Sequence, residues 1–68
     1  MSILAEIGLE ISKTMARKNI TLFELSRRSK IPEQHLDQII QAQVDVDLKT
    51  LAIIATALDA RFIISRLA

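Results

Sequence analysis

Two short amphipathic segments, separated by only three residues, dominate the middle of this sequence. The first spans residues 21–29 and opens with Thr21-Leu22-Phe23-Glu24, a pattern typical of a helix N-cap in which the glutamate reaches back. Lys30-Ile31-Pro32 ends it, because the residue before a proline avoids the helical region. Pro32 or Glu33 then begins a second segment that runs to about Gln41. We therefore predict two short helices joined by a tight turn.

Two longer helical patterns flank this pair. Ser2 is suited to cap a helix that runs to Lys18, and Asp47 one that covers residues 48–58. One glycine and one proline leave few other breaks, so an all-α, compact four-helix domain is expected over residues 1–68. Spacings of three and four indicate which side chains form the core. The predicted core consists of Ile3, Leu4, Ile7, Ile11 and Met15, then Leu25 with Leu22 or Phe23 beside it, then Leu36, Ile39 and Ile40, and finally Leu48, Leu51, Ile54, Ala55 and Leu58.

The tail, residues 60–68, has a different character. Phe62-Ile63-Ile64 is a continuous apolar run rich in β-forming residues, which favours a short β-strand, although a fifth helix remains an alternative. Half of the residues are hydrophobic, and a chain this small cannot bury that much apolar surface alone. We therefore expect two copies to pair through this tail. The residues predicted to form the dimer contact are Arg61, Phe62, Ile63, Ile64 and Leu67.

The charge is unevenly distributed although the net charge is only +1. Six basic residues and one acidic residue lie between Lys13 and Lys30, whereas one basic and five acidic residues lie between Ile31 and Asp59. The first half is therefore the part suited to phosphate groups. A solvated face with no ligand is an equally simple explanation of such a run.

The composition argues against several function classes. There is no cysteine and a single histidine, His35, so we predict no metal site, no cofactor and no catalytic set of nucleophile and base. No apolar run approaches the length of a membrane span, and the N-terminus lacks the pattern of a signal peptide. The expected location is the cytoplasm.

The outer face of the helix predicted over residues 33–41 carries the side chains best suited to forming specific hydrogen bonds with a ligand. Gln34, Gln38 and Gln41 are amides, and an amide can pair bidentately with adenine in the major groove of DNA. The preceding helix would set the angle at which this helix enters the groove. The pattern thus favours a helix-turn-helix that binds double-stranded DNA.

The stretch from Thr21 to Gln43 resembles the helix-turn-helix of the lambdoid phage repressor and Cro family, also called XRE-type. The similarity has no gaps across TLFELSRRSKIPEQHLDQIIQAQ, and LKTLAIIATALDA further on is similar to the family's fourth helix. In this resemblance Ser26 takes a small-residue position that is usually alanine. The sequence departs from the family at three places. Lys30 and Ala42 stand where the family usually has glycine, and Leu22 where it often has a phosphate-binding glutamine.

The resemblance implies a homodimeric regulator that represses or autoregulates a promoter from a palindromic operator. Carried over by position, the candidate base contacts are Glu33, Gln34, Asp37 and Gln38. The candidate contacts to the DNA backbone are Arg17, Lys18, Thr21, Arg27, Gln43 and Lys49. His35 is more simply a partly exposed helix residue.

A protein-interaction module is the main alternative. Such folds also serve as adaptors or antitoxins, and Glu33, Asp37 and Asp45 place three acids in or near the second short helix. An antitoxin that binds both its toxin and its own operator combines the two hypotheses. Salt dependence distinguishes them, because DNA binding weakens steeply as salt rises.

Overall fold

The computed structural model describes residues 2–61 and consists of four α-helices. These are α1 (Ile3–Lys18), α2 (Leu22–Ser29), α3 (Glu33–Ile40) and α4 (Leu48–Ala57). No strand occurs within the described residues, and none of their helices is long and apolar enough to cross a membrane. The predicted all-α fold is therefore confirmed. The tail strand and its residues Phe62, Ile63, Ile64 and Leu67 lie outside the described part of the chain.

Each helix begins where a side chain can accept a hydrogen bond from the first turn, with one exception. Ser2 accepts from the amide of Ala5 at 3.1 Å, and Thr21 from the amide of Glu24 at 3.1 Å. Asp47 accepts from the amide of Thr50 at 2.8 Å. The α3 helix starts after Pro32 without a side-chain cap, because proline fixes the entry angle instead. The three predicted N-caps are confirmed.

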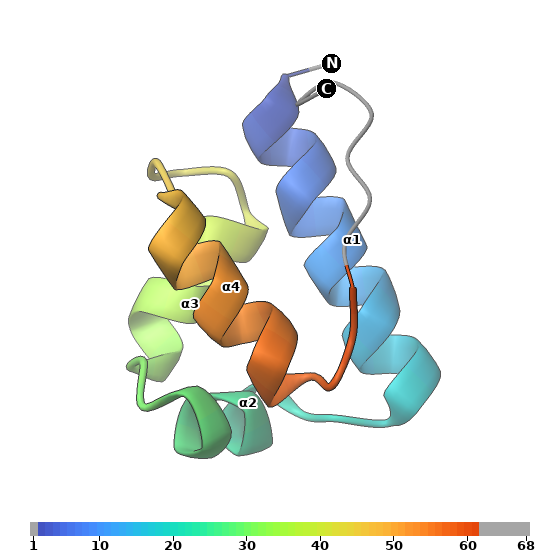
Figure 1. The fold of residues 1–68 in the computed structure, drawn as a ribbon. Helices are drawn as coiled ribbons and strands as arrows, with labels where there is room; N and C mark the ends of the chain where they lie inside the picture. The colour runs from blue at the N-terminus through green and yellow to red at the C-terminus, as the bar shows by residue number, and fades with distance from the viewer. Residues whose placement is uncertain (1, 62–68) are drawn as a thin grey trace.

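The core is aliphatic and draws on all four helices. In Figure 1, α1 runs along one side, α4 lies in front, and α2 and α3 form the other walls, with α2 packed against both α3 and α4. Ile11, Leu25, Leu36, Ile54 and Leu58 have no exposed surface. The remaining buried apolar side chains are Ile7 and Ile39, and Ile3, Met15, Leu22, Ile40 and Leu51 pack against the cluster.

Two core predictions need correction or refinement. Leu48 was expected to face the core, but its side chain is 73 % exposed. It occupies the first position of α4, where the Cα–Cβ bond points toward the helix N-terminus and thus past the edge of the core. Of the two candidates beside Leu25, the partly buried Leu22 packs against the core, whereas Phe23 is 64 % exposed.

Candidate nucleic-acid interface

A tight hydrogen-bonded turn sets the angle between α2 and α3. The hydroxyl of Ser26 donates to the carbonyl of Ile31 at 2.5 Å, and the amide of Ile31 donates to the hydroxyl of Ser29 at 3.2 Å. Lys30 closes α2 in the left-handed region at φ 65°, and its amide donates to the carbonyl of Ser26 at 2.9 Å. The conformation that the family usually gives to glycine is thus kept here by a lysine. Ser26, in the small-residue position, also holds the turn together.

The α3 helix is anchored on one face and open on the other. Leu36 is fully buried and Ile39 is 2 % exposed, and both belong to the core cluster. Gln34 is exposed, whereas Gln38 is only partly exposed. A helix held on a packed scaffold presents its outer side chains with little freedom to reorient, which is what direct reading of base edges requires.

All four predicted base-contact residues lie on α3, and none is buried. Glu33 and Asp37 are exposed beside Gln34, so the face that holds the amides also holds two carboxylates. A carboxylate accepts a hydrogen bond from cytosine but repels phosphate. This face can therefore discriminate between sequences more readily than it can supply affinity.

The cations predicted to meet phosphates have different surroundings. Arg27 is held by Glu24, with its Nη2 at 2.8 Å and 2.9 Å from the two carboxylate oxygens. Arg28 shares that carboxylate at 3.0 Å and also donates to the carbonyl of Ala57 at 3.3 Å, which ties α2 to the end of α4. The two arginines lower the pKa of Glu24, with the hydrogen bond from Arg27 as the largest cause.

The capping-box prediction is therefore half right. Thr21 caps α2 as expected, but Glu24 does not reach back to it. Its carboxylate turns along the helix to Arg27 and Arg28, three and four residues further on. On a helix surface these spacings bring opposite charges together, and the pairing with two guanidinium groups replaces the local bond.

The two basic residues at the end of α1 are engaged within the protein. The ammonium of Lys18 donates to the carbonyl of Asp59 at 2.6 Å, which joins the C-terminal ends of α1 and α4. Arg17 donates to the hydroxyl of Thr14 at 3.4 Å. In Figure 1 this end of α1 lies across the molecule from α3. A phosphate contact from Lys18 remains a prediction and would require the bond to Asp59 to give way.

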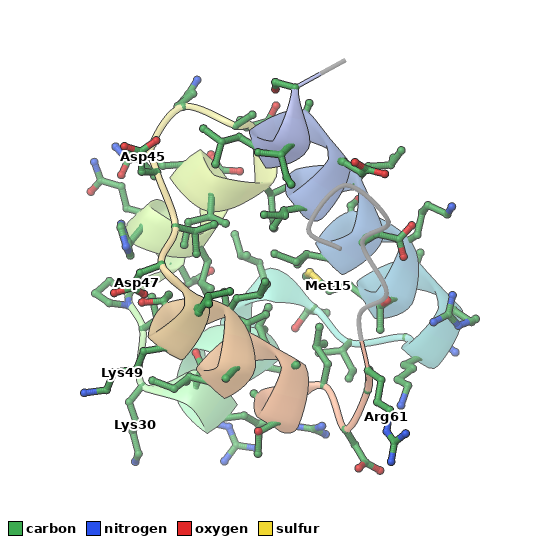
Figure 2. All side chains as sticks on the ribbon, turned by 45° about the horizontal axis from the view of Figure 1, so that its top comes forward. Met15, Lys30, Asp45, Asp47, Lys49 and Arg61 are labelled. Atoms are coloured by element: carbon green, nitrogen blue, oxygen red, sulfur yellow. The ribbon has the colours of Figure 1, made fainter. Side chains whose placement is uncertain are left out.

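Two other cations lie in the turn before α3 and in the first turn of α4. Figure 2 shows Lys49 and Lys30 at the same edge of the molecule, directed away from its body. Neither forms a hydrogen bond or ion pair within residues 2–61, and both are exposed. Lys49 was a predicted backbone contact, as was Gln43, which is exposed after α3. Lys30 was counted only as part of the basic run, and its place in the turn makes it a further candidate for phosphate.

The described residues bring together no group of three or more potential metal ligands. The single histidine, His35, is exposed on α3. The arrangement therefore offers an exposed polar face on α3, with an exposed lysine, Lys30, in the turn that precedes it.

Comparison with known proteins agrees with this geometry. A family model described as a Cro/C1-type HTH DNA-binding domain matches residues 10–62, which include all of α2, α3 and α4 and most of α1. No curated protein and no solved structure matches the chain. The family match therefore includes the whole helix-turn-helix formed by α2 and α3. The chain therefore belongs to the Cro/C1-type helix-turn-helix family of DNA-binding domains.

Proposed function

We propose that this protein is a sequence-specific transcriptional regulator, a repressor or autoregulator, that binds double-stranded DNA as a homodimer on a palindromic operator. The observation that supports this most is the position of Gln34, exposed on a short helix whose opposite face holds the fully buried Leu36. The whole of residues 1–68 acts as one domain in this proposal, without a cofactor and in the cytoplasm.

In the proposed mechanism α3 enters the major groove and reads bases through Glu33, Gln34, Asp37 and Gln38. Thr21, Arg27, Gln43 and Lys49 contact phosphates in this mechanism, and Arg17 and Lys18 are further candidates. Two copies joined partly through Arg61 and the residues after it present two such helices. Half-sites then lie about one helical turn, roughly 34 Å, apart. The bound dimer blocks RNA polymerase from the promoter, which accounts for repression.

Selection of bound duplexes from a random pool tests this function. We expect inverted repeats to be enriched, and affinity to fall steeply, by about 10³-fold or more between roughly 50 mM and 200 mM salt, if about six phosphates are contacted. An unenriched pool together with affinity that does not depend on salt would reject the proposal.

A protein-interaction role is the second candidate function. Glu33 and Asp37 on the exposed face of α3, together with a net charge of only +1, favour it over a purely electrostatic DNA binder. An antitoxin would combine this role with operator binding. Partner binding that persists at high salt, without any selected DNA sequence, would support this alternative.

A further inference from the structure

The outward face of α4 is apolar although it is turned to solvent. Leu48 is the most exposed large hydrophobic residue of the described chain at 73 %, and Ile53 is 39 % exposed. Ala52 and Thr56 are also exposed, and Lys49 is the only charged residue of the helix. A surface helix normally carries several charged side chains on such a face. This face therefore has the composition of a contact surface.

A hollow lies at the opposite end of the same face from Leu48. It has a volume of about 370 Å³ and is lined by Ala55, Thr56, Asp59, Ala60 and Arg61. Leu48, Ala52 and Thr56 are spaced by four residues, so they follow one line along the helix. Leu48 and the hollow beside Thr56 are separated by eight residues of α4. At 1.5 Å of rise per residue they therefore lie about 12 Å apart along the helix axis.

The two ends of this face carry opposite charges. Asp45 and Asp47 precede the helix, whereas Arg61 follows it, and Figure 2 shows them at opposite ends of α4. Neither Asp45 nor Arg61 has a hydrogen bond or ion pair within residues 2–61. The remaining charged groups nearby are Lys49 at the first end, and at the second end Asp59, with Lys18 bonded to its carbonyl and Arg28 bonded to that of Ala57.

We propose that a second copy of this chain docks on the outer face of α4, antiparallel to it and related by a two-fold axis near Ala52. In this arrangement Leu48 of each copy enters the hollow beside Thr56 of the other. Asp45 and Asp47, before α4 of one copy, then lie beside Arg61, after α4 of the other copy. A single two-fold rotation thus buries the exposed leucine, fills the hollow and brings Asp45 of each copy to Arg61 of the other, as an isologous contact requires.

This contact adds to the proposed tail pairing and shares Arg61 with it. A ten-residue helix is only about 15 Å long, so its face is smaller than the roughly 800 Å² per partner of a standard interface. The pair is therefore weak in solution. If the proposed function holds, two adjacent half-sites bring the copies together and the contact appears as cooperative DNA binding.

Single-cysteine variants test the geometry directly, because the chain has no cysteine of its own. The Ala52→Cys thiol lies at the two-fold axis, within the roughly 7 Å between Cα atoms that a disulfide can bridge. We expect mild oxidation to convert most of A52C to a covalent dimer. Ala16→Cys, exposed on α1, is the matched control and should stay largely monomeric. Equal cross-linking of the two variants would overturn the proposal.

Charge reversal tests the pairing of the ends. In the A52C background, Asp45→Arg or Arg61→Glu alone should slow disulfide formation several-fold, and the double variant should restore it. Restoration is expected only if the two residues meet across the pair. If the two charge reversals instead slow disulfide formation independently, so that the double variant is slower than either single variant, the arrangement is contradicted.

A final variant separates this inference from the proposed function. Ala52→Glu places a charge on the two-fold axis without touching the core, and circular dichroism verifies the fold. It should bind one half-site with the base preference of the parent protein but lose cooperativity at two. Cooperativity at the level of the parent protein would overturn the docking surface. Absence of any sequence preference in the parent protein would overturn the function and leave the cross-linking result intact.

Discussion

Gly8 in the middle of α1 lies against the carbonyl group of Ile40 at the end of α3. A Cβ atom at position 8 would overlap the Ile40 carbonyl oxygen and lie 2.9 Å from its carbonyl carbon. The carbonyl oxygen of Ile39 would be at 3.1 Å. The obstacle is backbone, which cannot rotate away as a side chain would. Gly8 therefore sets how closely α1 approaches the end of α3.

Gly8→Ala should destabilise the protein by about 1–3 kcal/mol, because a methyl group forced into a packed contact displaces backbone. In an exposed helix interior the same change stabilises by about 1 kcal/mol, so the sign of the effect is informative. Urea unfolding followed by circular dichroism measures it. Ser12→Ala, exposed on the same helix, is the control and should change stability by only a few tenths of a kcal/mol. A stabilised G8A protein would contradict the close approach.

Ala42→Gly should stabilise the protein by up to about 1 kcal/mol. Ala42 has φ 59° after α3, in the left-handed region where a Cβ is strained and glycine is not. Thermal unfolding at one fixed protein concentration is the measurement. Ala16→Gly serves as the control, because Ala16 is helical and exposed and its replacement should cost about 1 kcal/mol. If both changes destabilise equally, Ala42 is not strained.

Stability should fall in acid in part through Asp47 and Glu24. Hydrogen bonds from Thr50 lower the pKa of Asp47 from its ordinary value of 3.8, and Arg27 and then Arg28 lower the pKa of Glu24 from 4.5. Each carboxylate thus stabilises the fold fully above its ordinary pKa. That stabilisation is lost as the pH falls through the lower pKa of the folded state. Thermal melts from about pH 7 down to about pH 2 should show this loss.

Asp47→Asn separates the cap from its charge. Asparagine also caps helices but does not titrate, so this variant should melt near the parent at neutral pH and lose less stability in acid. Asp47→Ala should melt at a lower temperature across the whole range. An acid loss in D47N as large as that of the parent would assign the pH dependence to other groups.

Gln34→Ala should reduce discrimination at one operator position by about 1–3 kcal/mol, since an amide that pairs with a base edge is lost. Because Gln34 is exposed, its replacement should leave the fold unchanged. Competition binding with single-base operator variants measures the effect. Ser12→Ala, exposed on α1 and outside the proposed DNA contacts, is the control and should leave the base preference unchanged. Unchanged preference at every position would remove Gln34 from the reading surface.

The local sequence by itself determined the helices and kept the predicted base-contact residues of α3 out of the core. Ser2, Thr21 and Asp47 bond to backbone within three residues, so their capping was predictable. Residues 33–40 alternate apolar and polar side chains with helical spacing, which determined that Gln34 faces outward.

Only the tertiary structure decided how these helices use their side chains. Spacing alone placed Leu48 with Leu51 in the core, but the core ends before the first turn of α4, and Leu48 is left on the surface. Arg28 lies on α2, but its bond to the carbonyl of Ala57 exists only because α2 packs against the end of α4. The need for glycine at position 8 arises from the Ile40 carbonyl, thirty-two residues away in sequence. Such outcomes depend on where separate helices meet, which helical periodicity does not contain.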